Sequence, residues 1–146
     1  MRSQRIESHT LDNPDREEIT ALAIDPRNLN SFMVGTASGC VKRLWPVHQY
    51  HLRSATLVYK CDKPIKSLSF HLSGKLLGIT TDDEQPIVYS MLDKRVITLK
   101  KGHEGGATNV FFAGGYTCSL GLEGYLHLYE LKLSAAMEAS DDSDSE

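Results

Sequence analysis

Short apolar runs recur along this sequence at a nearly constant spacing, and this recurrence limits the folds available to the chain. The runs ITALAI, IKSLSF and ATNVFF begin at Ile19, Ile65 and Ala107, which are 46 and 42 residues apart. An aromatic residue follows each run at a similar spacing of 44 and then 40 residues, at Trp45, Tyr89 and Tyr129. The chain therefore contains about three related units between residues 19 and 132, and the third of them spans residues 102–132.

The runs have the character of β-strands. They are short, they are interrupted by glycine and proline, and Val, Ile, Thr, Phe and Tyr dominate them. Turn signals separate them, such as Asp25-Pro26-Arg27-Asn28 and His71-Leu72-Ser73-Gly74. A period of about 40 to 45 residues with about four strands per unit is typical of β-propeller blades. We therefore predict an all-β fold of about three four-stranded antiparallel units.

Composition excludes several classes of protein. No apolar run reaches about 18 residues, so we expect no membrane span, and the polar start MRSQRIESHTLDNPDREE does not resemble a secretory signal. The three cysteines, Cys40, Cys61 and Cys118, are odd in number and far apart, which favours reduced thiols in a cytoplasmic or nuclear protein. Five of the 19 acids lie in residues 138–146, which leaves 14 acids against 16 bases elsewhere. That balance is too small to favour direct binding of nucleic acid.

Three segments follow from these patterns. Residues 1–17 lack periodicity and are expected to form an N-terminal arm, residues 18–133 form the β domain, and residues 134–146 form an acidic disordered tail. In the tail, Ser140, Ser143 and Ser145 stand among acidic residues, and Ser143 has Glu146 three positions later. We predict that an acidophilic kinase phosphorylates this segment. The alternative is an inert, solubilising tail.

The third unit resembles the repeats of the WD-repeat β-propeller family. Gly102-His103 matches the Gly-His of that family, and Tyr129-Glu130 stands where Trp-Asp belongs. Glu123-Gly124 replaces the Asp-Gly of the turn before the last strand, five residues ahead of the aromatic residue. His71-Leu72-Ser73-Gly74 is similar to the first hairpin turn of such repeats. The resemblance covers about residues 19–132.

The first two units depart from the family pattern. They have Trp45-Pro46 and Tyr89-Ser90 in place of Trp-Asp, and no Gly-His precedes either of them. The family's buried group of His, Ser or Thr, Asp and Trp is therefore expected only in the third unit, through His103, Glu123 and Tyr129. Apolar packing is expected to hold the first two units, with Trp45 and Tyr89 in the core.

Three units are too few for a closed ring, since propellers typically have about four to eight blades. Three explanations stay open: the chain is a fragment of a larger propeller, a partner or a second copy supplies further blades, or the sheets pack in another way. Because the chain begins with Met and ends in a tail, we expect a short or truncated propeller protein that is completed by association.

Other residues that resemble reactive sites are better explained by structure. His48 and His51 have no third metal ligand nearby, and Asp82, Asp83 and Glu84 fall in a predicted turn. The glycines near positions 102–106 and 114–115 lack the Gly-Lys-Ser/Thr ending of a phosphate loop. Cys118 alternates within a strand, as a buried thiol does. We therefore expect no metal, no cofactor and no catalytic residue.

The resemblance implies a non-catalytic scaffold for protein–protein interaction within a multiprotein complex. Contacts are then expected on the loops between units, at residues 60–64 and 100–105. One alternative is an adaptor in RNA processing or ubiquitin ligation, although YELK at residues 129–132 has Lys where the ubiquitin-ligase motif has Arg. An enzyme on a propeller-like frame is a further alternative. It requires His and carboxylate side chains that converge on a pocket.

Overall fold

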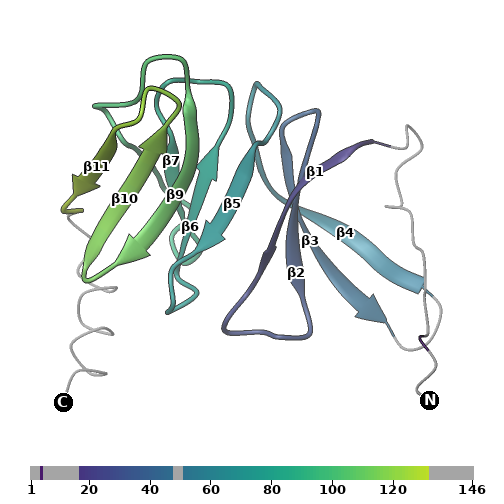
Figure 1. Ribbon diagram of the computed structural model, residues 1–146. Helices are drawn as coiled ribbons and strands as arrows, with labels where there is room; N and C mark the ends of the chain where they lie inside the picture. The colour runs from purple at the N-terminus through teal and green to yellow at the C-terminus, as the bar shows by residue number, and fades with distance from the viewer. Residues whose placement is uncertain (1–3, 5–16, 48–50, 132–146) are drawn as a thin grey trace, which may run out of the picture.

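The computed structural model describes residue 4 and residues 17–47 and 51–131, and in this part of the chain all regular structure is β-strand. Eleven strands form three antiparallel sheets, which stand side by side in chain order (Figure 1). The predicted all-β architecture of propeller blades is confirmed. Within the same residues, no helix has the length and apolar character needed to cross a membrane.

The first sheet has four strands in chain order, β1 (Ile19–Ile24), β2 (Phe32–Thr36), β3 (Cys40–Val47) and β4 (His51–Lys60). The second repeats this order with β5 (Ser67–Phe70), β6 (Leu76–Thr80), β7 (Ile87–Ser90) and β8 (Val96–Thr98). The third has three strands in the described part of the chain, β9 (Ala107–Ala113), β10 (Tyr116–Gly121) and β11 (Leu126–Tyr129). Each sheet is thus a meander of hairpins.

The core lies between neighbouring sheets. Met33 and Val41 of the first sheet pack against Leu68, Leu77 and Ile79 of the second. A second cluster joins the back of the second sheet to the third through Leu76, Val88, Leu99 and Val110. Side chains alternate along a strand, and the second sheet contributes apolar side chains to both clusters. It is therefore apolar on both faces and is buried between the other two sheets.

The same alternation leaves two sheet faces open. The first sheet turns Leu22, Ile24 and Phe32 away from the second sheet, and Leu22 and Ile24 are more than half exposed. The third sheet turns Phe111, Leu126 and Leu128 away from the second, and these side chains are exposed as well. We call these surfaces the front face and the back face. They are the faces that the missing neighbours of an incomplete ring would cover.

Tyr89 and Trp45 differ in their surroundings. Tyr89 is 4% exposed, and its ring centroid lies 5.2 Å from that of Tyr59, as expected for a core residue. Trp45, by contrast, is 36% exposed, so its expected place in the core is wrong. Trp45 follows the last β2–β3 pair, Phe32–Leu44, whereas Tyr89 pairs with Leu77 within the second sheet. Trp45 therefore lies past the end of this pairing and is not equivalent to Tyr89.

Candidate functional site

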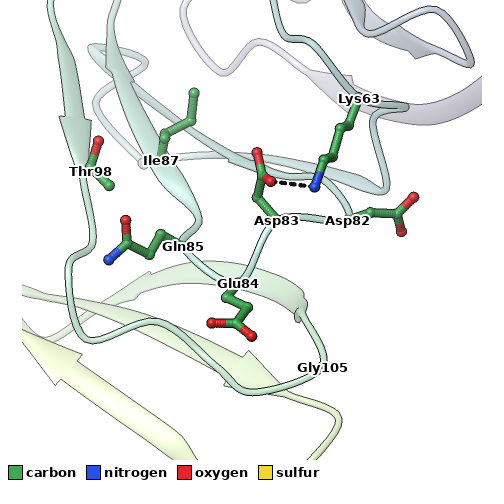
Figure 2. Close-up of a pocket in the computed structure, with 8 residues that line it drawn as sticks. All are labelled: Lys63, Asp82, Asp83, Glu84, Gln85, Ile87, Thr98 and Gly105. Atoms are coloured by element: carbon green, nitrogen blue, oxygen red, sulfur yellow. Dashed lines mark ion pairs between the residues drawn. The ribbon is translucent and has the colours of Figure 1, made fainter.

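Three loops meet at one end of the sheets and enclose a pocket. The segment 61–66 joins β4 to β5, the segment 81–86 joins β6 to β7, and the segment 99–106 joins β8 to β9. The pocket between them has a volume of about 770 Å³, and Figure 2 shows the residues around it. Its lining comprises Lys63, Asp82, Asp83, Glu84, Gln85, Ile87, Thr98 and Gly105. The two loops predicted to carry contacts therefore border one pocket, with a third loop between them.

Two ion pairs hold the middle loop to the first loop. Lys63 Nζ lies 2.6 Å from Asp83 Oδ1, as the dashed line in Figure 2 marks, and Lys66 Nζ lies 2.9 Å from Asp82 Oδ1. The hydrogen bond to Asp83, and then its charge, raise the pKa of Lys63. Solvent screens such exposed pairs, so they orient the loops more than they stabilise the fold.

Hydrogen bonds hold the middle loop to the third loop as well. The His103 backbone N–H donates to the Glu84 carbonyl at 2.7 Å, and the Gln85 side-chain Nε2 donates to the Lys100 carbonyl at 2.7 Å. Gly102 has a φ of 61°, and a Cβ there would lie 2.8 Å from the Glu84 carbonyl oxygen. Only glycine allows both the left-handed backbone and this close approach.

Asp82, Asp83 and Glu84 lie in the turn region between β6 and β7, as predicted. This middle loop is held in place by contacts with both neighbouring loops. Glu84 is exposed, and its carboxylate forms no ion pair with another described residue. With Lys63 and three acids around it, the pocket carries an excess of negative charge. It suits a partner that presents a basic side chain.

A buried polar network lies behind this surface in the third sheet. His103 Nε2 lies 2.6 Å from Ser119 Oγ, and His103 Nδ1 is hydrogen-bonded to Glu123 Oε1. Ser119 Oγ is also hydrogen-bonded to the Tyr129 hydroxyl at 3.2 Å. The structure thus brings together His103, Glu123 and Tyr129, which the sequence grouped, and adds Ser119. Gly124, with a φ of 90°, forms the turn that carries Glu123 back toward His103.

The His103–Glu123 contact affects the acidity of the carboxyl group. Burial acts to raise the pKa of Glu123, but the hydrogen bond with His103 and the neighbouring imidazoles outweigh it, so the pKa is lowered. The glutamate is therefore held in its charged form beside the imidazole.

Ser119, His103 and Glu123 follow the order of a Ser–His–acid triad, which is the convergence that an enzyme would require. Ser119, however, is fully buried and His103 is 2% exposed. The Ser119 hydroxyl also has the Tyr129 hydroxyl as a partner. A substrate carbonyl cannot reach a nucleophile enclosed in this way, so we interpret the network as structural.

The same site contains one group of metal-ligating side chains, His103, Glu123 and His127, whose ligand atoms lie within 4.8 Å of one another. The rings of His103 and His127 are stacked, with centroids 4.4 Å apart and planes at 20°. Lone pairs in nearly parallel planes do not converge on one ion, and both nitrogens of His103 already have partners. The geometry favours stacking over metal binding. His48, and the side chain of His51 at the start of β4, lie outside the described part of the structure.

Apolar packing replaces the network in the second sheet. Val110, Ser119 and His127 pair across the third sheet, and Leu68, Ile79 and Ile87 form the equivalent row in the second. Ile79 therefore stands where the third sheet has Ser119. Glu130, the last residue of the blade motif, is exposed after β11, and Ser140, Ser143 and Ser145 lie outside the described residues.

Sequence reasoning missed Ser119 and the role of the middle loop. Side chains alternate along β10, so Ser119 lies on the same face as Thr117, toward the second sheet, and Cys118 lies on the other face. That signal was available in the sequence. The contacts of Glu84 and Gln85 with residues 100–103 had no such signal, since they depend on how neighbouring sheets are placed.

Solved structures with a similar fold include the WD40 β-propeller domain of Doa1, which superposes with a TM-score of 0.65 at 17% identity. The match covers 84% of this chain and 40% of the Doa1 chain. The computationally designed protein Ika8 has a TM-score of 0.57 at 19% identity, over 76% of this chain and 32% of its own. No family model and no curated protein matches the sequence.

At these identities the likeness shows the fold alone. The chain spans less than half the length of either propeller chain, in agreement with its three sheets and two open faces. The described residues therefore have the fold of WD40 propeller blades, arranged as part of a ring.

Proposed function

We propose that this chain is a non-catalytic scaffold that binds partner proteins through the pocket between its loops. The observation that carries the proposal is the attachment of the 81–86 loop to both neighbouring loops, by Lys63–Asp83 on one side and Gln85–Lys100 on the other. A surface fixed in this way loses little conformational entropy when it binds, which favours affinity. Glu84 supplies a charged group for the partner.

The proposal includes completion of the ring by association within a multiprotein complex. The front face, with Leu22 and Ile24, and the back face, with Leu126 and Leu128, are both apolar. They lie at the two ends of the row of three sheets. Large exposed apolar patches mark interaction sites in soluble proteins. Blades from a partner or from another copy would cover them as the second sheet covers its neighbours.

The same proposal places the protein in the cytoplasm or nucleus. Cys40, Cys61 and Cys118 are all free, and the chain outside its acidic end is close to neutral. These features support a reducing compartment and a protein partner in preference to nucleic acid.

The test begins with affinity purification of the full chain from cells, followed by mass spectrometry to identify bound proteins. Binding of each purified partner is then measured by calorimetry for the unmodified chain and for Glu84→Lys. We expect Glu84→Lys to weaken binding at least about tenfold, because it reverses the charge of the pocket. Glu18→Lys, the same change at an exposed position just before β1, is the matched control.

Partners that bind Glu84→Lys and Glu18→Lys equally well would show that the pocket is not the binding site. Turnover of a substrate that is lost in Ser119→Ala would instead establish an enzyme and overturn the scaffold role.

A further inference from the structure

The outer edge of the third sheet is open at β11. The first two sheets end in a fourth strand, β4 or β8, whereas β11 is the last strand of the third sheet in the described part of the chain. An edge strand presents backbone N–H and C=O groups that are able to pair with another chain. Figure 1 shows β11 at the left margin of the molecule, with β10 as its one neighbour in the sheet.

A groove runs along this edge. It has a volume of about 630 Å³ and lies between residues 98–101, at the end of the second sheet, and residues 126–131, which include β11. It occupies the place that a fourth strand of the third sheet would take, beside β11 and against the end of β8. The groove and the open edge therefore coincide in the described part of the chain.

The lining specifies the chemistry of that element. Tyr129 and Leu131, which are partly exposed and pack on the buried Leu99, give the groove an apolar wall. Lys100 and Lys101 are exposed at the rim, against a single acid, Glu130. A strand that fits here has an apolar side chain toward Leu131 and carboxylates near the two lysines.

We propose that this groove binds an extended acidic–apolar segment of a partner protein, which adds to β11 as a fourth strand. Backbone pairing with β11 supplies affinity that is independent of sequence, and the wall of Tyr129 and Leu131 and the two lysines supply selectivity. Of the residues that line the groove, Thr98 alone also lines the pocket between the loops, and the proposal does not depend on the function proposed above.

The test uses a labelled peptide, acetyl-Asp-Glu-Val-Ile-Thr-Leu-Asp-Glu-amide, which carries the Val-Ile-Thr-Leu of residues 96–99 between acids. Binding to the full chain is followed by fluorescence anisotropy. Two further peptides are N-methylated, one at Val and Thr and the other at Ile and Leu. Because alternate amides of an added strand face its neighbour, we expect one methylated peptide to bind at least about tenfold more weakly and the other to bind within about twofold.

Charge reversal locates the site. The double variant Lys100→Glu/Lys101→Glu is expected to weaken peptide binding about tenfold or more. The control, Lys94→Glu/Arg95→Glu, makes the same change in the turn between β7 and β8 and should bind normally. No binding of the unmethylated peptide, equal effects of the two methylation patterns, or equal effects of the two charge reversals would each overturn the proposal.

Two other occupants give distinct results, and either would overturn the proposal. If the groove is filled by the chain's own acidic end, the full chain with Asp141→Asn, Asp142→Asn and Asp144→Asn will bind the peptide about tenfold more tightly. If a second copy fills it, light scattering will show a dimer that the peptide dissociates.

Discussion

Gly78 on β6 lies directly against Val110 on β9, so that a Cβ at position 78 would be 2.7 Å from Val110 Cγ1. This contact lets the second and third sheets approach closely. We expect Gly78→Ala to reduce the free energy of unfolding by about 1–3 kcal/mol, because the sheets must separate to fit the methyl group. Urea denaturation followed by tryptophan or tyrosine fluorescence measures the change.

A double-mutant cycle isolates this contact. Val110→Ala removes Cγ1, at 2.7 Å, and leaves Cβ, at 2.8 Å, so Gly78→Ala should cost less in that background. A cost that is unchanged by Val110→Ala would mean that the loss comes from the strand backbone and not from the contact between sheets.

The buried network predicts a second stability effect. Ser119→Ala leaves His103 Nε2 and the Tyr129 hydroxyl without their shared partner, and we expect a loss of about 1–3 kcal/mol in the free energy of unfolding. Ser38→Ala, at an exposed position in the turn between β2 and β3, is the comparison. If both variants were equally stable, the network would have no structural role.

The lowered pKa of Glu123 predicts a dependence of stability on pH. A carboxyl group whose pKa is lower in the folded state than in the unfolded state stabilises the fold above the unfolded pKa, and this contribution disappears as the pH falls through the folded pKa. The melting temperature of the unmodified chain should therefore exceed that of Glu123→Gln at neutral pH, and the two should converge in acid. Parallel curves for the two proteins would contradict this reasoning.

The thiol of Cys61 should be slow to react. Burial, and then the nearby Asp62 and Asp83, raise its pKa from 9.0 to about 11. Its thiolate fraction at neutral pH is then about a hundredfold lower than that of an unperturbed thiol, since each pKa unit is a factor of ten. In Cys40→Ser/Cys118→Ser, alkylation by iodoacetamide should be correspondingly slow and should accelerate up to about pH 11. Rapid alkylation at neutral pH would show that Cys61 is not buried.

The two open faces predict association. Light scattering of the purified chain should give a mass above the 16.2 kDa of one chain, and Leu128→Glu on the back face should reduce it. Leu72→Glu, at an exposed turn, should not. A stable chain of 16.2 kDa with a cooperative melt would show that three sheets suffice by themselves.

The repeat period was enough to predict the sheets, because strand spacing and turn residues are local properties of the sequence. It placed Tyr89 correctly, but the expected place of Trp45 in the core was wrong. The reason is that Trp45 lies past the end of the β2–β3 pairing, whereas Tyr89 lies within the β6–β7 pairing. Periodicity therefore locates a strand more reliably than it orients a side chain near the end of that strand.

The polar network was predictable in part, since His103, Glu123 and Tyr129 stand at the spacing of a known repeat. The pocket was not, because Lys63, Glu84 and Lys100 come from three loops that meet only when the sheets are assembled. Contacts of that kind depend on the angle between sheets, which the hydrophobic pattern does not encode.

The front and back faces have a consequence for handling the protein. Each chain that docks its back face on the front face of another leaves the same two faces at the ends of the growing stack. If the rotation between neighbours does not close a ring, such head-to-tail contacts extend without limit and produce fibres. Concentration would then set the length of the polymer, and any molecule that covers one of the two faces would terminate the series.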